Sequence, residues 1–174
     1  MSKRPLFLTS LFLLLLSLTV QNSYAQFGLE QQGIQPFEAS EQVMNDRQRE
    51  LVQKLVRENF GPIELQGATS ELYYLQKILD KGLISKDATF DLQAMGVVLG
   101  DIMAKNLSLQ WVTYEDERGK SRALRFGQTD QLLFPVTMIS RRYQNGLATD
   151  VQALYNEAKT WADKLRKSTP YNSQ

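Results

Sequence analysis

The chain has 174 residues and a formal net charge of +1, with 20 Lys and Arg against 19 Asp and Glu. It contains neither Cys nor His, which excludes disulfides, Ser-His-Asp and Cys-His catalysis, and the usual zinc sites. A near-neutral chain also lacks the broad basic field that drives non-specific nucleic-acid binding, so we expect no nucleic-acid partner.

The first 25 residues have the pattern of a secretory signal peptide. Lys3 and Arg4 supply positive charge, an interrupted apolar run follows over 6–20, and small side chains precede a cut after Ala25. A transmembrane anchor needs about 20 apolar residues, more than this run offers. We therefore expect cleavage between Ala25 and Gln26, a periplasmic or secreted protein, and membrane contact only transiently through the signal peptide. Losing Lys3 and Arg4 reduces the 20 basic residues to 18 against 19 acidic ones, a net charge of −1.

A flexible leader rich in Gln and Gly is expected at 26–39, followed by three helices. Apolar residues at helical spacing predict these helices at about 41–59, 70–80 and 89–106. Pro62 follows the first helix closely and cannot continue it.

The third predicted helix carries a stripe of small residues, Gly96, Gly100 and Ala104. Glycine inside a helix costs about 1 kcal/mol relative to alanine, so two glycines at this spacing require a reason. The stripe predicts that another element packs closely against this face of the helix.

The periodicity then changes from helical to alternating. Short segments at about 109–114, 123–126 and 132–136 predict strands, and their short links favour an antiparallel meander. A short helix at 138–145 and a last helix from about Thr149 complete the pattern.

The predicted fold is therefore α+β. N-terminal helices pack on a small antiparallel three-stranded meander, and a C-terminal helix closes the domain. We expect one domain over 40–168 and a tail at 169–174.

Several motifs occur in a fixed order between residues 72 and 154. They are LQKILD from Leu75, LQAMGVVLGD from Leu92, Trp111-Val112, DERG from Asp116, Ala123-Leu124-Arg125 and FPVTMISRR from Phe134. This series resembles the bacterial family catalogued as domain of unknown function 3806. The family pattern tends to have Lys where this chain has Arg141, which keeps the charge but changes the donor geometry. The family brings no assigned activity, ligand or catalytic residue, so the resemblance implies a domain boundary and no function.

The densest polar cluster consists of Thr137, Ser140, Arg141 and Arg142. If Thr137 caps a short helix, free N–H groups lie near two guanidinium groups, and a carboxylate or phosphate could dock there. The alternative is a purely structural role, in which one arginine pairs with an internal acid and the other extends into water.

Three acids are the candidate internal partners, namely Asp101, Asp116 and Asp130. Our hypothesis is that an acid from the third helix or from the hairpin holds at least one of the two arginines. The other arginine would then be available to an anionic group on a partner.

Trp111, Asp101 and Asp116 are weaker candidates. Trp111 could belong to a stacking platform on the sheet, although aromatic residues at strand spacing are more often core. Asp101 could be an acid/base or a metal ligand, but it could equally pair with an arginine or face solvent. Asp116 lies in a sequence without the alternating acids of a calcium loop, which favours a solvated turn.

The expected function is an exported, non-catalytic binding or interaction protein. Its expected partner is another envelope protein or an anionic ligand. A carboxylate-dependent hydrolase of an envelope polymer is the runner-up, and an immunity-type or inhibitor protein is the third alternative. No catalytic residue, metal site or cofactor is assigned.

Overall fold

A computed structural model describes residues 33–168. The predicted signal peptide, residues 26–32 of the predicted leader and the predicted tail lie outside the described residues. The helices are α2 (Ala39–Phe60), α3 (Leu72–Asp80), α4 (Thr89–Leu107), α5 (Met138–Gln144) and α6 (Val151–Ser168). The strands are β1 (Gly33–Pro36), β2 (Leu109–Asp116), β3 (Gly119–Phe126) and β4 (Leu132–Leu133), and the two single 3₁₀ turns are η1 (Thr69–Glu71) and η2 (Pro135–Thr137).

The fold is α+β, as the sequence predicts, but the number of strands predicted is wrong. Four strands form one antiparallel sheet in the order β1-β2-β3-β4. The additional strand, β1, lies where the sequence predicts a flexible leader, and it pairs Ile34 with Tyr114 and Pro36 with Val112. Pro36 is tolerated because β1 is an edge strand, where a missing N–H does not interrupt a ladder on both sides.

The strand predicted at 132–136 is shorter than expected. It ends after Leu133, and Pro135 instead begins η2. The fixed φ of proline suits the first position of a helical turn, so the chain leaves the sheet at this point.

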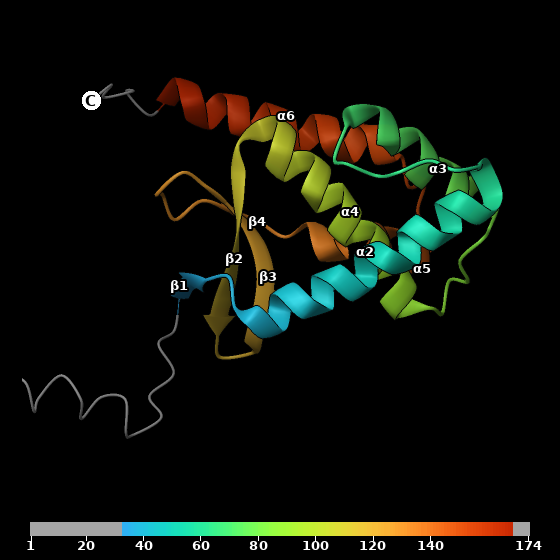
Figure 1. Ribbon diagram of the computed structural model, residues 1–174. Helices are drawn as coiled ribbons and strands as arrows, with labels where there is room; N and C mark the ends of the chain where they lie inside the picture. The colour runs from blue at the N-terminus through green and yellow to red at the C-terminus, as the bar shows by residue number, and fades with distance from the viewer. Residues whose placement is uncertain (1–32, 169–174) are drawn as a thin grey trace, which may run out of the picture. The chain divides into compact units, whose positions relative to one another are not determined.

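Helix α4 is the centre of the domain. It packs against α2, α5, α6, β2 and η2, and Figure 1 shows it between α2 and α6. Its predicted apolar stripe is fully buried, with Leu92, Met95, Leu99 and Ile102 all at 0% exposure. Within residues 33–168, no helix is both long and apolar enough to cross a membrane.

The small-residue stripe of α4 does permit close packing, which confirms that prediction. A Cβ atom added at Gly96 would overlap the carbonyl oxygen of Val136 in η2. One added at Gly100 would overlap the indole ring of Trp111 and the ring of Pro135. The two glycines therefore let η2 and β2 approach the α4 backbone, which fixes the distance between this helix and the sheet.

Candidate functional site

A groove of about 880 Å³ lies between α2, α4 and the segment that joins α2 to α3. Polar residues line the α2 wall, and the opposite wall comes from α4. Leu65, Gln66, Gly67 and Glu71 complete the lining. The α2 wall contains Arg49, Glu50, Gln53, Lys54 and Arg57, and the α4 wall contains Val98, Asp101 and Lys105.

Side chains hold the connecting segment in place along the groove. The Gln53 amide donates to the carbonyl of Ile63 at 2.6 Å and accepts from the N–H of Leu65 at 2.8 Å. The Gln53 side chain therefore bonds to the backbone of this segment as a neighbouring β-strand would. Glu71 is only 5% exposed, and its two carboxylate oxygens accept the N–H groups of Gln66 and Gly67 at 2.7 and 3.0 Å. A buried carboxylate satisfied by two backbone donors is fixed in position.

The α4 wall holds the same segment from the other side. Lys105 donates to the carbonyl of Gln66 at 2.9 Å, and Asn106 donates to the carbonyl of Gly67 at 2.8 Å. A Cβ at Gly67 would lie 3.3 Å from the Lys105 side chain, and the φ of Gly67 is +78°. Glycine is suited to this position because it adopts positive φ readily and lets the lysine stem pass over it.

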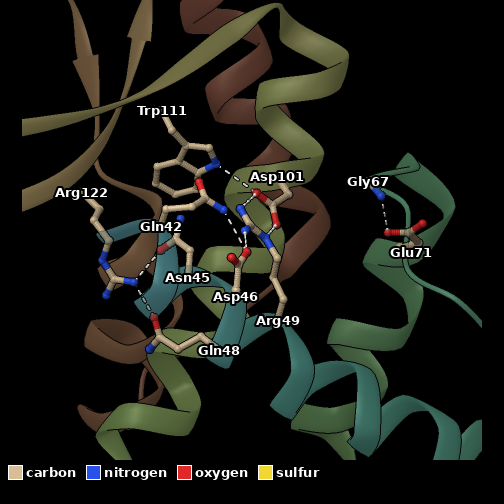
Figure 2. A network of polar contacts seen from close by, with 10 residues as sticks. All are labelled: Gln42, Asn45, Asp46, Gln48, Arg49, Gly67, Glu71, Asp101, Trp111 and Arg122. Carbon is tan, nitrogen blue, oxygen red and sulfur yellow. Dashed lines mark hydrogen bonds and ion pairs between the residues drawn. The ribbon is translucent and has the colours of Figure 1, made fainter. Parts of the chain in front are cut away.

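At one end of the α2 wall, an ion pair joins the two walls of the groove. The Arg49 guanidinium donates Nε–H and Nη2–H to the two oxygens of Asp101 at 2.6 and 2.8 Å, and Trp111 donates its indole N–H to the same carboxylate at 2.9 Å. Figure 2 shows Asp101 facing both residues. Hydrogen bonding to Asp101 raises the pKa of Arg49, although burial opposes this. Asp46 adds a second carboxylate at 2.6 Å from Arg49.

A second polar cluster, between α2 and the sheet, lies beside this end. Arg122 of β3 donates to the side-chain oxygens of Asn45 and Gln48 at 2.6 and 2.5 Å, and it lies 3.3 Å from Glu41. Both amide residues are fully buried, and Figure 2 shows the guanidinium directed at them. Burial lowers the pKa of Arg122, and the charge of Glu41 offsets this in part.

Thr137 directly precedes α5, and Ser140, Arg141 and Arg142 lie within it, the two arginines in its last turn. Ser140 is buried at 2% exposure, and both arginines are exposed. Thr137 precedes α5 without a side-chain capping bond. Arg142 lies 3.7 Å from Glu157 of α6.

The hypothesis that an acid from α4 or from the hairpin holds one of these arginines is wrong for residues 33–168. Asp101 pairs with Arg49 instead, and Asp116 pairs with Arg118 within its own turn. Asp101 and Asp116 therefore have partners other than Arg141 and Arg142.

The structure does bring together two residues that the sequence suggests separately, Asp101 and Trp111. Trp111 is half-buried, stacks on Phe37 at 5.8 Å and turns its N–H toward Asp101. Asp101 also bonds to Arg49, which lies 52 residues before it in the chain, so no local motif links the three residues. Polar residues recur at helical spacing along α2, but a helix face exposed to solvent has the same pattern. The sequence therefore does not mark this face as part of a site.

Comparisons with known proteins find a family model that matches part of the chain and a solved structure with a similar fold. The family model described as "Domain of unknown function (DUF3806)" matches residues 71–155. No curated protein matches the chain.

A crystal structure from Bacteroides thetaiotaomicron VPI-5482, at 1.50 Å resolution, has a similar fold with a TM-score of 0.67 and 19% sequence identity. The match covers 76% of this chain and 49% of that one, so this chain corresponds to about half of that protein. The resemblance expected from the sequence motifs is confirmed, because residues 71–155 match the model of the family described as domain of unknown function DUF3806.

Proposed function

We propose that this protein is an exported, non-catalytic binding protein that holds a ligand or a partner segment in the groove between α2 and α4. The observation that carries the proposal is the groove itself. Its volume of about 880 Å³ is within the range of roughly 300–1,000 Å³ that is typical of ligand sites. Its shape is set by side-chain hydrogen bonds on both walls, so the site is formed before a ligand arrives.

The state of the carboxylates supports binding rather than hydrolysis. Both oxygens of Asp101 accept hydrogen bonds from Arg49, and both oxygens of Glu71 accept backbone N–H groups. A general acid or base needs a carboxyl oxygen that can reach the substrate. Among the described lining residues, Glu50 is the carboxylate that has no hydrogen-bond partner. A glycosidase-type mechanism needs two available carboxylates, so Glu50 alone does not supply it.

An inhibitor that acts through its hairpin has less support from the geometry. Trp111 donates its indole N–H to Asp101 at 2.9 Å, and Asp116 accepts the N–H of Arg118 at 2.8 Å within the turn. Neither side chain projects as an anchor for a partner enzyme. Export is proposed from the signal-peptide pattern of residues 1–25.

One wall of the groove comes from outside the residues that match the family. Helix α2 ends at Phe60, whereas the family match begins at residue 71. We therefore propose that α4 and Glu71 supply the part of the site that belongs to the family domain. The α2 wall would adapt the groove to the ligand of this particular protein.

A groove-filling variant tests this proposal. Gln66 is exposed, and its backbone N–H and C=O are already bonded, so Gln66→Trp places a large ring at the groove without removing those bonds. The purified protein, Gln66→Trp and the matched surface variant Lys164→Trp are each incubated with envelope extract, and bound species are identified by mass spectrometry. A species that wild type and Lys164→Trp retain and Gln66→Trp loses supports the proposal. Equal retention by all three contradicts it.

A further inference from the structure

We infer that the occupant of the groove is an extended acidic peptide segment, an inference that rests on the proposed binding function. Polar groups along the groove differ in how many of their hydrogen-bonding positions are occupied within residues 33–168. Cationic donors with unused hydrogen-bonding capacity outnumber unused carboxylates there. An occupant that complements these donors supplies hydrogen-bond acceptors, and carboxylates accept the strongest bonds from cationic donors.

The carboxylates of the lining are mostly satisfied. Asp101 accepts three hydrogen bonds, from Arg49 and Trp111, and Glu71 accepts two from the backbone. Within residues 33–168, the lining carboxylate that makes neither a hydrogen bond nor an ion pair is that of exposed Glu50.

The cations of the lining retain donors. Lys105 uses one N–H on the Gln66 carbonyl, which leaves two, because an ammonium group carries three. Lys54 is 75% exposed in its side chain and forms an ion pair with Glu58 at 3.8 Å, a distance beyond a hydrogen bond. Its ammonium donors therefore make no hydrogen bond within residues 33–168. Arg57 bonds Glu64 through Nε and Nη2, and its Nη1 donors make no bond within the described part of the chain.

The positions of these cations favour an extended ligand over a compact anion. Lys54 and Arg57 are one helical turn apart on α2, which separates their Cβ atoms by about 5–6 Å. Lys105 belongs to the opposite wall. A single phosphate is held best by donors that converge on one point, for which a guanidinium fork or a helix N-terminus is suited. Separated cations suit several carboxylates along a chain.

The remaining lining residues suit a peptide. Leu65 and Val98 offer apolar contacts between the charged groups, and exposed Gln66 offers its side-chain amide. The lining residues given above include no aromatic side chain on which a sugar ring could stack. We therefore assign the groove to a peptide with carboxylates at intervals and small apolar side chains between them.

Fluorescence anisotropy with defined probes tests the inference. The probe is a fluorescein-labelled ten-residue peptide of alternating Glu and Ala, and the comparison probe has Lys in place of Glu. The expected result is binding of the Glu peptide that weakens with salt and exceeds binding of the Lys peptide. Lys105→Gln and Lys54→Gln should each weaken it about three- to tenfold, whereas Lys164→Gln, an exposed lysine on α6, should not.

The other outcomes overturn the inference. It fails if the Lys peptide binds equally well, if inorganic phosphate competes at the same concentration as unlabelled Glu peptide, or if Lys105→Gln binds like Lys164→Gln while its thermal unfolding is unchanged. Failure of the Glu peptide, combined with an envelope species that Gln66→Trp loses, would refute the peptide and retain the proposed binding function. If Gln66→Trp also retains every species, both proposals fail.

Discussion

The ion pair between Arg49 and Asp101 holds α2 against α4 at one end of the groove, and its contribution can be measured. The two residues share two charge-assisted hydrogen bonds, and their side chains are 30% and 25% exposed. Hydrogen bonds to charged groups contribute about 1.5–3 kcal/mol each when protected from water, and partial exposure reduces this. We expect a coupling free energy of about 1–2 kcal/mol.

A double-mutant cycle isolates that coupling. Urea unfolding followed by circular dichroism gives the free energy of unfolding for wild type, Arg49→Ala, Asp101→Ala and the double variant. The cycle cancels the bonds that each residue makes to third residues. The control is the same cycle on Lys159 and Asp163, an exposed i,i+4 pair on α6, for which we expect about 0.3–0.5 kcal/mol. Equal coupling in the two cycles would refute the view that Arg49 and Asp101 join the walls of the groove.

Three further predictions concern stability. Gly100→Leu should lower the thermal midpoint by several degrees, because the branched side chain would overlap the indole ring packed there, at a cost of about 1–3 kcal/mol or more. Lys164→Leu, at an exposed position, should leave the thermal midpoint unchanged. Equal midpoints for Gly100→Leu and Lys164→Leu would contradict close packing at Gly100. Glu71→Gln should speed proteolysis between residues 63 and 67, because one acceptor for the backbone N–H groups becomes a donor; an unchanged cleavage pattern would show that other contacts hold the segment. Hydrogen bonds from Gln76 and then Lys77 lower the pKa of Asp80, so its stabilisation is present above the unfolded-state pKa and is lost as the pH falls through the folded-state value. Unfolding of Asp80→Asn should therefore vary less with pH in acid than unfolding of wild type, and identical profiles would contradict this.

Most of the fold follows from local pattern. Helix α4 has an apolar stripe at helical spacing and a glycine stripe beside it, and the structure buries the first and packs η2 and β2 on the second. Both features depend on neighbours along one helix, which a sequence displays directly.

Strand β1 could not be predicted in this way. Its four residues, Gly33–Pro36, show no alternation of apolar and polar side chains, and Pro36 argues against a strand. The strand forms because its backbone pairs with β2, about 80 residues later in the chain. Tertiary pairing of this kind outweighs local propensity.

The groove could not be predicted from the sequence, because the residues that form it come together only through tertiary packing. Arg49 and Lys54 belong to a polar helix face that is indistinguishable in sequence from a solvated one. The contact of Arg49 with Asp101 spans 52 residues. The sequence singles out Asp101 and Trp111 as isolated polar and aromatic residues, and only the packing of α2 on α4 joins them into a site.

The measurement that tests the central claim most directly is a map of where the Glu-Ala peptide binds. Backbone amide chemical shifts of the isotope-labelled protein are recorded as the unlabelled peptide is added. The account predicts that the largest shifts cluster at Lys54, Gln66 and Lys105, around the groove. Largest shifts around Arg141 and Arg142 on α5, with the groove unaffected, would contradict it and place anion binding at the exposed arginines instead.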